Sequence, residues 1–177
     1  MNLKLALASA QALSLVVFVM IAIWYVVPWI KTQRRADALI PLLWIHAFRY
    51  VALQGFQAQK AGFPISDSGR DQILYGDLLG MALAVMAIVA LRYRSRLSIP
   101  LVWILVAETI LDTVANVTSG IREHLFGLAT GVTWFIVSFY VPLLMVSLGL
   151  VVWQLYSRRG EPLARSISDK PAVSNAA

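Results

Sequence analysis

The chain has 177 residues, of which 59 % are hydrophobic and 14 % charged, and its mean hydropathy is +0.73. Soluble domains average about 45–50 % apolar and about 25 % charged residues, so the composition excludes an ordinary soluble domain. The absence of cysteine excludes disulfides, thiolate metal sites, iron–sulfur clusters and cysteine nucleophiles. The net charge of +6 does not predict a nucleic-acid partner, because basic residues in so apolar a chain set its orientation in a membrane instead.

Five apolar stretches are each long enough to cross a bilayer, which takes about 20 residues of α-helix. They run over residues 10–30, 38–57, 73–91, 98–120 and 132–155. The connections between them are too short for a separate domain, so the sequence predicts one all-α, polytopic integral membrane protein, a five-helix bundle over residues 1–157. Residues 158–177 are rich in Ser, Ala, Pro and charge without apolar periodicity, which predicts a disordered tail.

The basic residues are unevenly divided between the two ends of the predicted bundle. One end holds ten of them: Lys31, Arg34, Arg35, Arg92, Arg94, Arg96, Arg158, Arg159, Arg165 and Lys170. The other end holds four: Lys4, Lys60, Arg70 and Arg122. Because Lys and Arg concentrate in cytoplasmic loops, we expect the amino terminus outside, the carboxyl terminus in the cytoplasm, and the bacterial inner membrane as the location.

Five ionisable side chains interrupt the apolar spans: His46 and Arg49 in the second, Asp77 in the third, and Glu108 and Asp112 in the fourth. Each costs about 2.5–3.5 kcal/mol at mid-helix on insertion scales, so such groups are generally buried, paired and functional. At about 1.5 Å per residue from the outer end of each span, His46 and Glu108 reach one depth near the bilayer centre. Arg49 and Asp112 share the next layer, and Asp77 lies in a third, shallower one.

Three further polar residues extend this set toward the outside. Asn116 follows Glu108 and Asp112 at i, i+4, i+8 spacing, so the three line one stripe of the fourth span. Tyr50 shares a face of the second span with the arginine, and Tyr140 reaches the arginine's depth from the fifth span. The pattern predicts a polar pocket that opens outward and closes near the membrane centre.

The charges in this predicted pocket do not balance, because Arg49 faces three carboxyl groups, those of Asp77, Glu108 and Asp112. Either one carboxyl group carries a proton, for which Glu108 is the candidate because it is deepest, or a cation completes the balance. The leading hypothesis is therefore a membrane protein that binds a small polar or cationic ligand, with proton-coupled transport or sensing. Five spans are few for a complete transporter, so this hypothesis includes a homo-oligomer.

Two other functions agree with the same residues. In the first, the protein is an intramembrane enzyme that acts on a lipid-soluble substrate, with His46 and Glu108 as acid and base. In the second, it is a subunit of a larger membrane complex, and its buried charges pair with a partner chain. His46, Glu108 and Asp112 are also candidate ligands for a divalent metal. Gly76 and Gly80 predict close packing of the third span. No cofactor is expected, since the chain has no Gly-rich phosphate loop and only two histidines.

Overall fold

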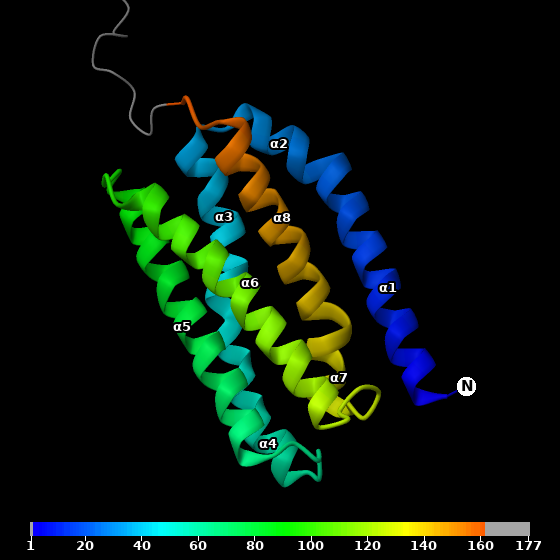
Figure 1. Cartoon of the computed structure of the whole chain (residues 1–177). Coiled ribbons are helices and arrows are strands. Elements are labelled where there is room, and N and C mark those ends of the chain that lie inside the picture. Colours follow the sequence, from blue (N-terminus) through cyan, green and yellow to red (C-terminus); the bar gives the residue numbers. More distant parts are fainter. Residues whose placement is uncertain (1, 162–177) are drawn as a thin grey trace, which may run out of the picture.

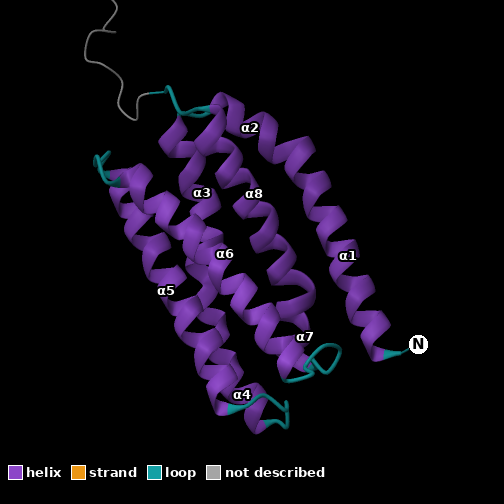
Figure 2. Ribbon diagram, viewed as in Figure 1, coloured by secondary structure: helices purple, strands orange, loops and turns teal. Residues whose placement is uncertain are grey.

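The computed structural model describes residues 2–161, and every regular element among them is a helix (Figures 1 and 2). In chain order the elements are α1 (Leu3–Ile21), η1 (Ala22–Val26), α2 (Val27–Thr32), α3 (Arg35–Ala47), η2 (Phe48–Leu53), α4 (Gln54–Lys60), α5 (Asp67–Arg92), α6 (Ser98–Arg122), α7 (Gly131–Phe135), η3 (Ile136–Tyr140) and α8 (Val141–Ser157). The labels η1 and η3 denote π-helical turns, and η2 is a 3₁₀-helix.

Consecutive elements join into five continuous helices that are long and apolar enough to cross a membrane: Leu3–Thr32, Arg35–Lys60, Asp67–Arg92, Ser98–Arg122 and Gly131–Ser157. The five predicted helices are therefore confirmed, and each extends beyond its predicted stretch at one or both ends. The extensions are more polar than the predicted stretches, because a helix continues past the apolar segment by which hydropathy identifies it. The largest consequence concerns the third helix, which begins at Asp67 rather than at residue 73.

The three irregular turns lie inside long helices. The π-helical turns η1 and η3 are followed by Pro28 and Pro142, at the first turn of α2 and of α8. Proline has no N–H to donate and its ring crowds the carbonyl four residues earlier, and a wider turn relieves that contact. The 3₁₀-helix η2 contains no proline. It carries Arg49, and a 3₁₀ stretch in mid-helix often marks a strained or functional segment.

The order of the helices in space differs from their order in the chain (Figure 1). α5 packs against α6, α3 and η2, and α3 in turn packs against α8. α1 lies at the edge, where it packs on α8 and η3 and is the least buried of the five long helices. The second long helix, built of α3, η2 and α4, is therefore central, and its 3₁₀ turn is held against α5.

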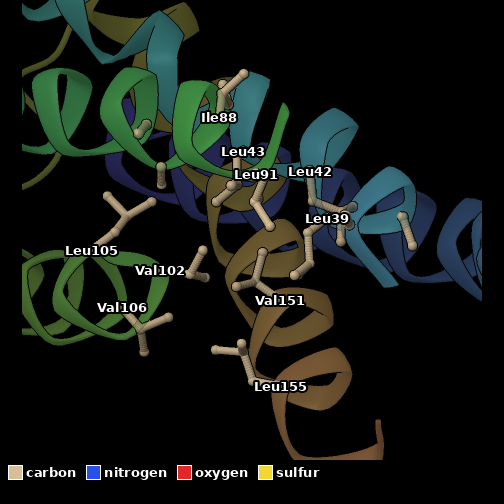
Figure 3. Close-up of a cluster of buried hydrophobic side chains, with 14 of the residues drawn as sticks. Leu39, Leu42, Leu43, Ile88, Leu91, Val102, Leu105, Val106, Val151 and Leu155 are labelled. Atoms are coloured by element: carbon tan, nitrogen blue, oxygen red, sulfur yellow. The ribbon is translucent and has the colours of Figure 1, made fainter. Parts of the chain in front are cut away.

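The apolar core lies in one half of the bundle's length, and Figure 3 shows its side chains from close by. It is built from the first part of α3, the last part of α5, the first part of α6 and the last part of α8, which the up-and-down course of the chain brings together. Its most buried side chains include Leu39, Leu43, Leu91, Val102 and Leu155. The other half of α3–η2, α5 and α6 carries the polar residues that the sequence singled out.

Arg158 closes the end of the bundle where α2 and α8 stop. Its guanidinium donates to the carbonyl oxygens of Gln33 (2.7 Å) and Ile30 (3.4 Å) at the end of α2, where the Ile30 carbonyl also accepts the N–H of Gln33 (3.1 Å). It also pairs with Glu161 (2.6 Å), and the hydrogen bond from Arg158 holds the pKa of Glu161 below its usual value. Packing contacts thus extend past residue 157, the predicted end of the membrane domain. The rest of the predicted tail, residues 162–177, lies outside the described residues.

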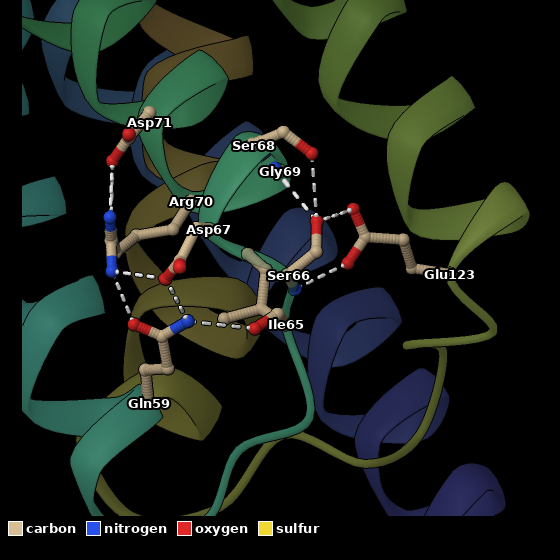
Figure 4. A network of polar contacts seen from close by, with 9 residues as sticks. All are labelled: Gln59, Ile65, Ser66, Asp67, Ser68, Gly69, Arg70, Asp71 and Glu123. Atoms are coloured by element: carbon tan, nitrogen blue, oxygen red, sulfur yellow. Dashed lines mark hydrogen bonds and ion pairs between the residues drawn. The ribbon is translucent and has the colours of Figure 1, made fainter.

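The opposite end is fixed by a carboxylate that joins α5 to α6 (Figure 4). Ser66 precedes α5, and both its backbone N–H and its Oγ donate to Glu123 (2.8 and 2.7 Å). Ser66 Oγ also caps the helix by accepting from the N–H of Gly69 (2.9 Å). A Cβ at Gly69 would collide with the Glu123 carboxylate, so a side chain there would displace it from Ser66. Arg70 ties the first turn of α5 to its own acidic residues and to α4 through Asp67, Asp71 and Gln59.

Candidate functional site

Arg49 lies on η2, in the middle of the second long helix, and is 1 % exposed. Its guanidinium donates to one carboxylate from α5 and two from α6: Nε to Asp77 Oδ1 (2.8 Å), Nη1 to Glu108 Oε2 (2.6 Å) and Nη2 to Asp112 Oδ2 (2.5 Å). These four side chains are called the Arg49 cluster below. Asp77 lies about 15 Å along α5 and Glu108 about 15 Å along α6 from the start of each helix. Because the two helices run in opposite directions, the cluster lies near the middle of the bundle.

The cluster corrects the predicted layers. Arg49 and Asp112 meet, as their common depth predicted. Asp77 does not form a separate, shallower layer but binds the same guanidinium. The reason is that α5 begins at Asp67, which places Asp77 deeper in its helix than a start at residue 73 does. Glu108 also binds this arginine rather than lying in a separate layer with His46, because Glu108 and Asp112 are one helical turn apart on α6 and each accepts from a different Nη atom.

Two glycines of α5 make room for the cluster. A Cβ at Gly80 would overlap the guanidinium of Arg49, and a Cβ at Gly76 would overlap the carboxylate of Asp112. The i, i+4 pair that predicts close packing of this span therefore has a more specific effect. It lets polar side chains from the second and fourth long helices lie directly against the α5 backbone.

Two further side chains of α6 form hydrogen bonds with the residues of the Arg49 cluster. Thr109 Oγ1 accepts from Arg49 Nη1 (3.1 Å) and lies 3.3 Å from Glu108 Oε2, to which it donates. Asn116 Nδ2 donates to Asp112 Oδ2 (3.0 Å), which confirms that Asn116 shares a stripe with Asp112. Thr109 is a member of the site that the sequence pattern does not indicate. Its hydroxyl gives no distinct signal, because a helical threonine commonly bonds its own backbone, as Thr113 does here to the Thr109 carbonyl (2.7 Å).

The acidic side of the cluster retains unused hydrogen-bonding capacity. Glu108 Oε1 and Asn116 Oδ1 are buried and accept no hydrogen bond from the described residues. The side chains of Asp77, Glu108 and Asp112 are 19 %, 10 % and 10 % exposed, whereas that of Arg49 is 1 % exposed. The positive charge is thus enclosed, and the negative groups around it are the ones with residual access. This arrangement suits the uptake of a proton or a small cation.

The two predicted tyrosines differ in their surroundings. Tyr140 on η3 donates its hydroxyl to the carbonyl of Ile45 (2.8 Å), three residues before the start of the 3₁₀ turn that carries Arg49. It therefore joins the fifth long helix to the second at the level of the cluster. Tyr50 is 45 % exposed and makes no side-chain hydrogen bond with the rest of the described chain. The structure does not bring Tyr50 into the Arg49 cluster.

His46 is wholly buried, and neither ring nitrogen has a hydrogen-bond partner among residues 2–161. The predicted contact between His46 and Glu108 is absent, because a common depth does not make two side chains point toward each other. The described part of the chain contains no group of three or more His, Asp or Glu side chains arranged to hold a metal ion. His46, Glu108 and Asp112 are therefore not brought together as a metal site.

Two hollows in the described part of the molecule lie away from the cluster. One is a cavity of about 220 Å³ between the start of α3 and the turn that follows α5, and the other is an apolar groove of about 370 Å³ between the first long helix and α8. The Arg49 cluster lines neither of them. The outward-opening pocket inferred from the sequence stays a prediction.

The core, the Arg49 cluster and the two glycines all lie within one region that a family model matches. The model described as "Domain of unknown function (DUF8737)" matches residues 6–156. The chain belongs to this family. Among curated proteins and among solved structures, none matches the chain. The matched region contains nearly all of the five long helices of this chain.

Proposed function

We propose that the chain is a multi-pass integral membrane protein whose Arg49 cluster binds a proton or a small cationic ligand, in transport or sensing. The amino terminus lies outside and the carboxyl terminus in the cytoplasm, and the location is the bacterial inner membrane. The unequal distribution of basic residues between the two ends supports this orientation. The lengths and apolar character of the five helices support insertion.

The observation that carries the proposal is the binding of three carboxylates by one guanidinium. With all groups ionised, one positive and three negative charges leave the cluster two charges short of neutrality. An uncompensated charge in an apolar interior is very costly, so the cluster is stable only when protons or a cation supply the missing positive charge. Glu108 Oε1, which accepts no bond from the described residues, is the oxygen best placed to receive it.

Binding at the cluster is coupled to the backbone through η2. A proton or cation that binds one carboxylate weakens the ion pair between that carboxylate and Arg49. The guanidinium then holds α5 and α6 less tightly. Arg49 lies on a 3₁₀ turn, which relaxes toward α-helical geometry by a local change in backbone angles. The second long helix thereby shifts relative to α5 and α6, which is the movement that transport or sensing requires.

The test uses the full chain in nanodiscs, with carboxyl groups labelled for infrared and NMR measurements. We expect the wild type to show a carboxyl signal that changes with pH or with added sodium or potassium, and Glu108→Gln to remove or shift that signal. Asp67→Asn is the matched control, because the Asp67 side chain is 81 % exposed and lies outside the cluster. A wild-type protein whose buried carboxyl groups respond neither to pH nor to these cations would overturn the proposal.

A role as a subunit of a larger membrane complex is the second candidate, and α1 is the observation in its favour. The principal contacts of α1 with other long helices are all with the fifth one, and α1 exposes a broad apolar surface that includes Leu13, Val16 and Val17. Another membrane helix fits such a surface as well as lipid does. Native mass spectrometry of the protein extracted in a mild detergent tests this role, and a bare monomer that still shows the carboxyl response contradicts it.

A further inference from the structure

A cavity of about 220 Å³ lies at the end of the bundle where α3 begins and α5 ends, the upper end in Figure 1 and far from the Arg49 cluster. Its charged lining residues are Arg34, Asp37, Arg92 and Arg94, and Ile40 and Leu91 contribute an apolar wall. The lining comes from the start of α3, the end of α5 and the turn that follows α5. Because these segments are distant in the sequence, the cavity exists only in the folded chain.

The charge of this lining is strongly positive. Three arginines face one aspartate, which leaves two positive charges in excess. None of these four side chains forms an ion pair or a side-chain hydrogen bond with another residue in the described range. The guanidinium groups are exposed at the surface and their N–H donors are available to a ligand.

Arg94 occupies a backbone position that favours glycine. Its φ is +52°, in the turn where the N–H of Ser95 bonds the carbonyl of Ala90 (2.9 Å) and the N–H of Arg94 bonds that of Leu91 (3.1 Å). This is the Schellman ending of a helix, in which a left-handed residue is usually glycine because it has no Cβ. The arginine is held there at a conformational cost, and its side chain lines the cavity.

The start of α3 adds to the positive potential. Ala36 and Asp37 belong to its first turn, whose N–H groups have no partner within the helix, and both residues line the cavity. The N-cap residue, Arg34, makes no side-chain capping bond to these groups. The positive end of the helix dipole is thus directed at the same space as the three arginines.

We propose that this cavity binds a phosphate group, either of an anionic lipid headgroup or of a soluble phosphate compound. Arginine suits this ligand because its planar fork donates two parallel hydrogen bonds to phosphate oxygens. A phosphate monoester carries about −1.5 to −2 charges at neutral pH and the phosphodiester of a lipid headgroup carries a single negative charge, so the excess of two positive charges suits either form. Orientation in the membrane requires basic residues at this end of the bundle but does not require them to line a cavity. Arg96 is such a residue, because it lies at this end and does not line the cavity.

The test compares four variants of the full chain in phosphatidylcholine nanodiscs: Arg34→Gln, Arg92→Gln, Arg94→Gly and, as the matched control, Arg96→Gln. One arm adds inorganic phosphate and follows binding by phosphorus NMR. The other arm adds phosphatidylglycerol to the nanodiscs and counts retained lipids by native mass spectrometry. We expect each of the first three variants to weaken binding by roughly tenfold or more, since one charge-assisted pair is lost, and the control to bind as the wild type does.

The pattern of binding identifies the source of the phosphate. Binding of phosphatidylglycerol without inorganic phosphate assigns the site to a lipid headgroup, and binding of inorganic phosphate assigns it to a soluble compound. Arg94→Gly separates binding from stability, because it relieves the left-handed backbone and should raise the melting temperature while it weakens binding. No binding in either arm, or equal losses in Arg96→Gln and the three cavity variants, would refute the site.

Discussion

The two halves of the bundle are held together in different ways. Around Leu43 and Leu155 the helices meet through close-packed apolar side chains, whereas around Arg49 they meet through three ion pairs to a single guanidinium. An apolar contact tolerates exchange of one side chain for another of similar volume. An ion pair depends on the presence and the charge of both partners. The apolar packing therefore does not depend on pH, whereas the ion pairs of the polar half depend on the protonation of their carboxyl groups.

The substitution Arg49→Leu tests most directly whether ion pairs hold the polar half together. We expect it to lower the free energy of unfolding by about 3–5 kcal/mol, because three carboxylates remain in the interior without their guanidinium. Denaturant titration in bicelles measures the effect. The loss should be smallest at low pH, where protonation removes the uncompensated negative charge.

Two controls separate charge from shape in this variant. Adding Asp77→Asn, Glu108→Gln and Asp112→Asn to Arg49→Leu removes every formal charge of the cluster and should recover most of the stability. Leu43→Ala in the apolar half should destabilise the protein by loss of packing without altering the pH dependence. If Arg49→Leu is as stable as the wild type at neutral pH, the ion pairs do not hold this half together.

Gly80→Ala probes the same half by volume alone. The added Cβ would overlap the Arg49 guanidinium, which cannot move away without breaking its bonds to the carboxylates. We expect a loss of about 1–3 kcal/mol, as for overpacking of a core, and an altered pH response. Gly149→Ala is the matched control, because no atom lies within 4 Å of a Cβ there. In the α8 interior that change should be neutral or stabilising. Equal effects of the two substitutions would show that Gly80 serves helix propensity only.

The five helices could be predicted from the sequence because crossing a bilayer requires a long apolar run, and composition alone reveals such a run. The contact between Arg49 and Asp112 could be predicted as well, since equal depth on neighbouring helices is a one-dimensional property. Asp77 was placed too shallow because hydropathy does not register the polar first turns of α5, which belong to the same continuous helix. An error of six residues at the start of a helix becomes an error of about 9 Å in depth.

Other features of the site depend on rotation about the helix axis, which depth does not determine. His46 shares the predicted depth of Glu108, yet no hydrogen bond joins them. The 3₁₀ turn that begins two residues after His46 changes the angle between successive side chains, and it contains no proline from which the sequence could predict it. The role of Gly80 is equally hidden, because a glycine pair predicts close approach without indicating that an arginine side chain is what approaches. Tertiary contacts decide these points.

The smallest expected effect concerns Glu161, at the end of the apolar half. Its hydrogen bond with Arg158 lowers its pKa, so the pair stabilises the fold at pH values above the usual pKa of glutamate, and this contribution is lost as the pH falls through the lowered value. Because the Glu161 side chain is 47 % exposed, Glu161→Gln should change the free energy of unfolding at neutral pH by only about 0.5 kcal/mol. Arg158→Gln should cost more, since it also releases the carbonyls of Ile30 and Gln33. Thermal melts of both variants in one detergent test this ranking. Equal losses would mean that the contacts of Arg158 with the carbonyls at the end of α2 add nothing to the stability beyond the surface ion pair.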